Sequence, residues 1–229
     1  MSKANPLTAK QSRGGLITGI VVVAVLIAAL ATGVAVQYAR SHGNVSAGGG
    51  GSEPAVITGP GTNGQGVTVG KSGAANKIEL FLDFRCPHCK EFEDAAGPEI
   101  DKLVDDGTAT LTYYPLAFVD PEVSPRAAEG FAAAAAAGKA RGYADALYEN
   151  FGKAWTDDQL IDLGKQLGIT DAKFADGIRN SSYASWLESI GTTAQQRGVT
   201  GTPTVFVNGK QLSAGQLTPE GIKAAASAH

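Results

Sequence analysis

The feature that most constrains this chain is a pair of cysteines, Cys86 and Cys89, placed between an apolar run and a helical pattern. The apolar run, residues 78–84, has the character of a strand, and a helical pattern over residues 90–104 follows the cysteines. These are the only two cysteines in 229 residues. Any thiol chemistry of this protein therefore belongs to this pair.

A helix N-terminus gives the two cysteines different expected reactivities. Its exposed backbone N–H groups and positive dipole end favour an anion, so Cys86 should ionise below the pKa of about 8.5 of a free thiol. A thiolate attacks disulfides, and a thiol of low pKa is also a good leaving group. We therefore expect Cys86 to be the nucleophile and Cys89, one turn further on, to be its resolving partner. Pro87 suits the first turn because its missing N–H would have no intrahelical acceptor there.

Three other uses of a cysteine pair fit this sequence less well. A structural zinc site needs four ligands, and the chain offers one pair and three scattered histidines. Covalent haem attachment needs a histidine directly after the second cysteine, where this chain has Lys90. A structural disulfide that closes so short a loop would stabilise the fold little. Redox chemistry is the reading that the strand and helix around the pair favour.

The N-terminal part of the chain predicts a membrane anchor. Residues 16–36 carry no charged side chain, and this length suffices to cross a hydrocarbon core of about 30 Å. Three basic residues precede the run and one follows closely, which predicts a cytoplasmic N-terminus. A cleaved signal peptide is the alternative, but its apolar core normally spans only about 7 to 15 residues. We therefore expect a cytoplasmic tail (residues 1–15), an uncleaved single-pass transmembrane helix (residues 16–37) and an extracytoplasmic remainder, where disulfides persist.

Residues 38–75 are rich in glycine, with four in succession at residues 48–51. This composition predicts a flexible linker, within which residues 67–69 favour a short edge strand. The formal charge of the whole chain is −3, and its distribution does not indicate binding to nucleic acid.

Residues 76–229 predict an α/β domain. A second strand is expected at residues 108–114, and the strand, helix and strand together predict a parallel unit. Five helical patterns follow within about residues 122–198, one of them opened by a capping box at Thr156. The large apolar residues of these patterns are expected to form the core of a helical insertion: Leu147, Phe151, Trp155, Phe174 and Trp186.

The end of the chain returns to strand patterns. Residues 204–207 and 210–212 flank Asn208-Gly209, which favours a type I′ hairpin turn because both central residues need positive φ. Pro203 leads into the first of these strands, a position at which proline is allowed. A final helix is expected over residues 218–228, with Thr218 as its cap.

The order of these elements and two motifs carry a resemblance to a known family. The motifs are Cys86-Pro87-His88-Cys89 and residues 197–209, which contain Thr202-Pro203. Over about residues 76–229 the chain resembles the thioredoxin superfamily, and specifically the DsbA-type thiol:disulfide oxidoreductases, and its anchor resembles actinobacterial members. The resemblance implies a thioredoxin-like α/β fold with an inserted helical subdomain. It also implies a cis Thr202-Pro203 bond beside the cysteines and a groove for unfolded substrate.

The resemblance further implies a reaction. A substrate thiolate would attack the Cys86–Cys89 disulfide at Cys86, and a second substrate thiol would resolve the mixed disulfide, so that secreted or surface proteins acquire disulfide bonds. His88 would stabilise the Cys86 thiolate by hydrogen bonding or charge, the alternative being an exposed histidine without a role. The backbone at Thr202, next to Pro203, would pair with an extended substrate strand.

The expected partners follow from the same resemblance. Reoxidation would need a membrane protein of the DsbB-like or VKOR-like, quinone-coupled kind. We expect a monomer, and no cofactor or metal besides the redox-active disulfide.

Two other functions remain open at this stage. The first is a disulfide isomerase or reductase, because Thr before the cis-proline is commoner in those relatives. Isomerases usually carry an added dimerisation domain, however, and residues 38–75 are too glycine-rich to be one. The second is a non-catalytic, chaperone-like binding module.

One position differs from the family pattern. Thioredoxin and DsbA carry a buried acid six residues before the first cysteine, and this chain has Leu80 there. Asp83 and Glu79 are expected on the other face of the strand, so the sequence leaves open which group accepts the proton of Cys89.

Overall fold

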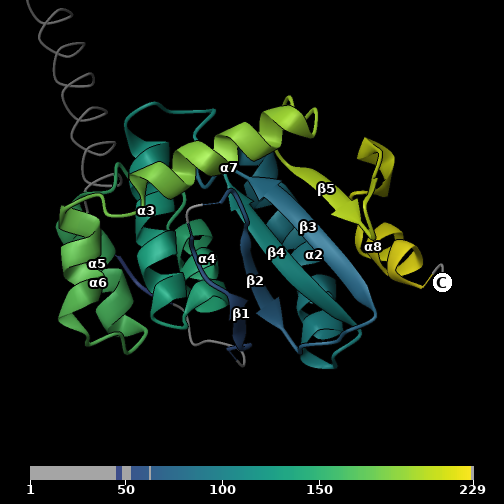
Figure 1. Cartoon of the computed structure of the whole chain (residues 1–229), viewed down its shortest axis with the longest axis horizontal. Helices are drawn as coiled ribbons and strands as arrows, with labels where there is room; N and C mark the ends of the chain where they lie inside the picture. Colours follow the sequence, from purple (N-terminus) through teal and green to yellow (C-terminus); the bar gives the residue numbers. More distant parts are fainter. Residues whose placement is uncertain (1–44, 48–52, 62, 228–229) are drawn as a thin grey trace, which may run out of the picture. The chain divides into compact units, whose positions relative to one another are not determined.

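A six-stranded mixed sheet forms the centre of the described structure (Figure 1). The computed structural model describes residues 45–47, 53–61 and 63–227. The order of the strands across the sheet is β1 (Val56–Thr58), β2 (Val67–Gly70), β4 (Ala109–Pro115), β3 (Asn76–Leu82), β5 (Thr204–Val207) and β6 (Lys210–Gln211). Strands β3 and β4 are parallel, as predicted, and the other neighbours are antiparallel.

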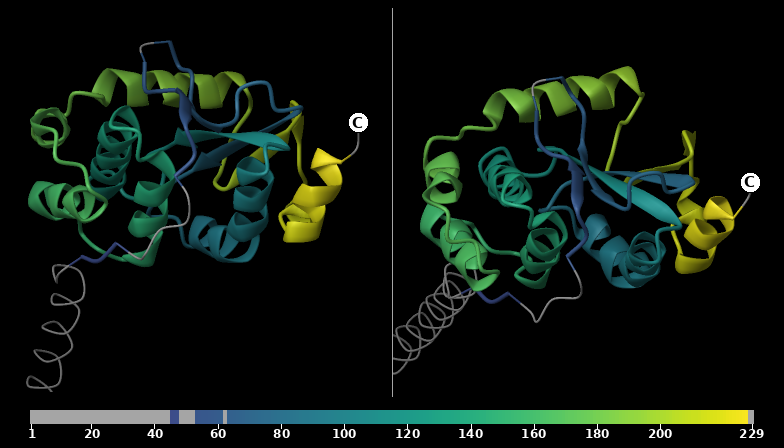
Figure 2. Two further views of the ribbon diagram at one scale, coloured as in Figure 1. Left: turned by 90° about the horizontal axis from the view of Figure 1, so that it is seen from below. Right: turned by 60° about the horizontal axis from the view of Figure 1, so that its bottom comes forward.

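Helices cover both faces of this sheet. Helices α2 (Pro87–Asp105) and α8 (Pro219–Ala226) lie side by side on one face, while α7 (Ala184–Gln196) crosses the other (Figure 2). The central strand β3 is apolar towards both faces, and Ile78, Leu80 and Phe81 are buried. This is the pattern expected of a strand that is covered on both sides.

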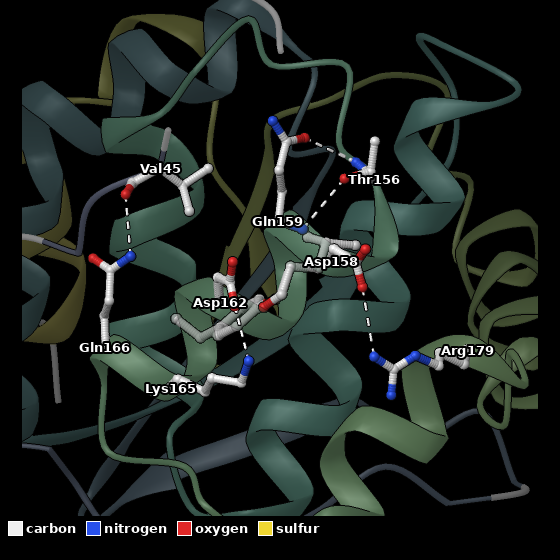
Figure 3. Close-up of polar contacts among 10 residues, drawn as sticks. Val45, Thr156, Asp158, Gln159, Asp162, Lys165, Gln166 and Arg179 are labelled. Carbon is white, nitrogen blue, oxygen red and sulfur yellow. Dashed lines mark hydrogen bonds and ion pairs between the residues drawn. The ribbon is translucent and has the colours of Figure 1, made fainter. Parts of the chain in front are cut away.

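Five helices lie between β4 and β5, which confirms the predicted helical insertion. Besides α7 they are α3 (Val123–Ala136), α4 (Ala140–Glu149), α5 (Asp157–Gln166) and α6 (Ala172–Arg179). The capping box at the start of α5 is present, because the backbone N–H groups of Thr156 and Gln159 each donate to the other residue's side chain (Figure 3). Four of the five predicted core residues are buried. Phe151 is not, because it lies in the turn after α4 with 37% of its surface exposed.

The predicted linker is wrong for residues 53–61 and 63–75, which belong to the folded unit. Val67 and Val69 of β2 are fully buried, and β2 pairs with β1 on one side and β4 on the other, so it is not an edge strand. Residues 45–47 also contact the insertion, where the side chain of Gln166 donates to the carbonyl of Val45 over 3.1 Å (Figure 3). The glycine content alone predicted a linker. It could not show that β2 pairs with β4, which lies far away in the sequence.

The predicted tail (residues 1–15) and transmembrane helix (residues 16–37) lie outside the described residues. Among the residues that are described, no helix is long and apolar enough to cross a membrane.

The C-terminal predictions are confirmed. Asn208 and Gly209 have φ values of 52° and 79°, as a type I′ turn requires. A short 3₁₀ helix (η1, Ala214–Gln216) then leads to α8, and the side chain of Thr218 accepts a hydrogen bond from the N–H of Gly221 at its start.

Candidate active site

The two cysteines lie at the N-terminus of α2, directly beyond the carboxyl end of β3. Cys86 is the N-cap residue with extended backbone angles, and Pro87 lies in the first turn of the helix, as predicted. The helix then continues without interruption through Pro98. Both cysteines are free thiols and both are buried. Cys86 thus lies at the N-terminus of α2, although its side chain accepts no hydrogen bond from the first N–H groups of the helix.

Cys89 is held as a neutral thiol. Burial raises its pKa to about 12, although hydrogen bonds from the Asp83 backbone and the Thr202 side chain work in the opposite direction. At neutral pH its thiolate is therefore very sparsely populated. The division of roles between Cys86, which attacks or is attacked, and Cys89, which acts second, stays a prediction, and a neutral Cys89 thiol is compatible with it.

The Thr202-Pro203 bond is cis, as the resemblance implied. Strand β5 runs antiparallel to β3 with Thr204 opposite Phe81, so the residues before β5 reach the end of β3 where the cysteine turn begins. The thiol of Cys86 donates to the carbonyl of Thr202 over 3.3 Å. The structure thus brings the two sequence motifs into direct contact.

His88 does not face the Cys86 thiol in this structure. Its side chain is 77% exposed, and its Nδ1 lies 3.0 Å from Oε2 of Glu91, one turn further along α2. The expected contact with Cys86 is therefore absent from the described contacts of His88, and the imidazole pairs with a carboxylate in solvent instead.

Asp83 shapes the turn that carries Cys86, a role that the sequence analysis missed. Its buried carboxylate accepts the N–H of Arg85 over 2.8 Å, and those of Phe118 and Val119 over 2.8 and 2.9 Å. Its carbonyl accepts the N–H of Cys86 over 2.9 Å. An Asp directly after an apolar strand is a recognisable signal for such a turn. Because three donors already occupy this carboxylate, it serves the backbone rather than the thiols.

Glu79 has a structural partner rather than a catalytic one. Arg197, at the end of α7, pairs with both carboxylate oxygens of Glu79, with Nη2 3.0 Å from Oε2. The Arg197 guanidinium also lies 4.1 Å from the centre of the Phe206 ring on β5. This pair joins α7, β3 and β5 five residues before Thr202.

Acidic side chains of the cysteine helix α2 and of the neighbouring α4 interact with one another. Leu80 of β3, at the position of the acid that the resemblance led us to expect, is buried. Burial raises the pKa of Glu93, one turn beyond Cys89, to about 8, and repulsion from Asp145 and Asp101 adds to this rise. The pKa of Asp145 is raised to about 7, also mainly by burial. Arg141 on α4 pairs with Asp101 on α2 over 2.8 Å and offsets part of the repulsion.

Comparison with known proteins agrees with this geometry. The sequence profile of the family described as Thioredoxin matches residues 62–227. The thiol:disulfide interchange protein DsbA of Salmonella typhimurium is 29% identical over 170 residues, which cover 69% of this chain and 76% of that protein. DsbA of Escherichia coli K12 is 28% identical over 165 residues, which cover 66% of this chain and 72% of that one.

Solved structures share the fold. MdbA, a thiol-disulfide oxidoreductase from Corynebacterium diphtheriae, superposes with a TM-score of 0.62 at 22% identity, over 81% of this chain and 98% of MdbA. BdbD from Bacillus subtilis superposes with a TM-score of 0.64 at 24% identity, over 76% of this chain and 97% of BdbD.

With a strand, a helix that begins at a Cys-Pro-His-Cys motif and a facing cis-proline, the chain belongs to the thioredoxin family. Within that family it is a protein thiol:disulfide oxidoreductase, and the curated relatives that it resembles are DsbA proteins.

Proposed function

We propose that this protein introduces disulfide bonds into secreted or surface polypeptides outside the cytoplasm. The observation that carries the proposal is the asymmetry of the two thiols. Cys86 lies at a helix N-terminus against the carbonyl of Thr202, while burial keeps Cys89 protonated with a pKa of about 12. A thiol–disulfide exchange reaction needs one sulfur that is stable as a thiolate and a second sulfur that stays protonated while the mixed disulfide exists.

The reaction begins from the Cys86–Cys89 disulfide. A substrate thiolate attacks Sγ of Cys86, the Cys86–Cys89 bond breaks, and the sulfur of Cys89 leaves and takes up a proton. A second substrate thiolate then attacks the substrate sulfur of the mixed disulfide, so that the substrate disulfide forms and Cys86 departs. The substrate loses two electrons and the dithiol of this protein gains them. The backbone beside the cis bond at Pro203 offers a carbonyl with which an extended substrate segment can pair.

The location and partners of the protein are part of the proposal. The charge-free run at residues 16–36 supports a single-pass anchor that holds the domain at the outer side of the cell membrane. The reduced dithiol must pass its electrons on, and a quinone-coupled membrane protein of the DsbB-like or VKOR-like kind is the partner that the family relationship supports.

Equilibration of the protein with glutathione tests the direction of electron flow. An oxidase should show a reduction potential above the about −200 to −230 mV of glutaredoxins. It should also restore activity to reduced, unfolded ribonuclease A faster than to ribonuclease A with scrambled disulfides. Faster recovery of the scrambled form would identify an isomerase instead, and a potential below this range would identify a reductase.

The variant Thr202→Val refines this test. It keeps the backbone carbonyl near Cys86 but removes the hydroxyl that hydrogen-bonds Cys89. We expect it to fold and to retain activity, with a changed potential or rate of substrate release. A variant that fails to fold would contradict the assignment of the substrate contact to the backbone.

A further inference from the structure

A cavity of about 540 Å³ lies inside the helical insertion, apart from the cysteine pair. Its walls come from the loop after β4 and from α3, α5, α6 and α7, and its apolar lining includes Leu116, Phe118, Leu160, Ile178 and Leu187. A cavity of this size and lining is typical of sites that enclose an apolar group.

The charged residues around the cavity are largely committed to other contacts. Arg126 lies 3.6 Å from Asp157, and Arg179 lies 3.5 Å from Asp158, a pair drawn in Figure 3. The buried carboxylate of Glu129 accepts the N–H of Tyr183 over 2.9 Å at the start of α7. The lining that remains for an occupant is mainly apolar, with Glu188 as a further charged residue on its wall.

The loop that forms one wall of the cavity is tied to the cysteine turn through a single residue, Asp83. Its carbonyl binds the N–H of Cys86, and its carboxylate binds the N–H of Phe118. These two hydrogen bonds keep the backbone nitrogens of Cys86 and Phe118 within about 12 Å, which about four extended residues span. Phe118 is 50% exposed. It therefore offers an apolar surface between the cysteine turn and the cavity.

We propose that this cavity binds an aromatic or long aliphatic side chain of the polypeptide whose cysteine reacts at Cys86. The inference rests on the proposed function. The occupant is a side chain of the substrate rather than a free small molecule, because a chain that is attached at Cys86 passes the exposed Phe118 within a few residues. Pairing at Thr202 uses the backbone of the substrate and accepts any sequence. The cavity adds a preference for one apolar residue about four positions from the reacting cysteine.

Gly191 of α7 provides a way to fill the cavity without strain. It lines the cavity, and a Cβ atom added to it would meet nothing within 4 Å. The variant Gly191→Phe therefore places a ring in the space that the substrate side chain would occupy, and Gly191→Leu fills it with a smaller group. The next residue, Thr192, is exposed, so Thr192→Phe is a matched control that adds the same ring to the solvent side of the same helix.

Two ten-residue peptides serve as probes, each with one cysteine and with either Phe or Ser four positions away. The Phe is placed before the cysteine in one set and after it in another. The oxidised full-length protein is mixed with each peptide, and the rate of mixed disulfide formation is measured by rapid quenching and mass spectrometry. The reaction of the wild type with glutathione is measured in parallel.

We expect the wild type to react with one Phe peptide on the order of tenfold faster than with its Ser counterpart, as burial of a Phe side chain predicts. This ratio should fall to about one in Gly191→Phe or Gly191→Leu, and should persist in Thr192→Phe. Equal rates for Phe and Ser peptides in the wild type, or a ratio that survives in folded Gly191 variants, would overturn the cavity assignment. Failure of the wild type to react with glutathione would instead overturn the proposed function.

Discussion

Glu93, on the cysteine helix α2, should make the stability of the fold depend on pH. Glu93 is half-buried as a residue, but its carboxyl group is enclosed against Gly97, where an added Cβ would lie 2.5 Å from Oε1. Burial and the nearby carboxylates raise the pKa of Glu93 from 4.5 to about 8. We therefore expect Glu93→Gln to stabilise the fold at high pH.

The sign of the effect follows from proton linkage. In the unfolded chain Glu93 loses its proton near pH 4.5, while in the folded protein it keeps it until about pH 8. Because the folded state binds more protons between these values, the free energy of unfolding falls as pH rises through this window. A shift of about 3.5 pKa units corresponds to at most about 5 kcal/mol. Partial exposure of the residue lowers the expectation to about 2 to 3 kcal/mol.

Urea unfolding of the reduced protein, followed by circular dichroism, measures this difference. Wild type and Glu93→Gln should be equally stable at pH 4, where both side chains are neutral, and the variant should be more stable at pH 9. Glu91→Gln, at an exposed site on the same helix, is the matched control and should show little change. A Glu93→Gln variant that is no more stable than the wild type at pH 9 would refute the reasoning.

Three further perturbations test other contacts. Cys89→Ala should accumulate mixed disulfides with substrate through Cys86, seen on non-reducing gels, whereas equal trapping by Cys86→Ala would reverse the assigned roles. Arg197→Met should cost about 2 kcal/mol in urea unfolding because it removes the cationic partner of the part-buried Glu79 and leaves it only the hydroxyl of Tyr114. Glu79→Gln, added to the Arg197→Met variant, should recover part of the lost stability. If it recovers none, the proposed importance of the Glu79–Arg197 pair is wrong. Thr156→Ala should cost about 1 kcal/mol by removing the cap of α5; an unchanged unfolding midpoint would contradict this.

The sequence by itself determined the features that depend on near neighbours. The Cys-Pro-His-Cys motif between a strand and a helix, the capping box at Thr156 and the turn at Asn208-Gly209 all follow from contacts within a few residues. Their backbone preferences are local, so the residue types sufficed to predict them. The pairing of the two motifs at the site came from the family resemblance.

Only the tertiary structure decided which distant segments meet. Strands β1 and β2 joined the sheet because β2 pairs with β4, about 40 residues later, and a glycine-rich composition does not encode that partner. Asp83 became the anchor of the cysteine turn because its carboxylate meets Phe118 and Val119, which follow another strand. Each outcome depends on where a second chain segment lies, and the pattern of one segment does not contain that position.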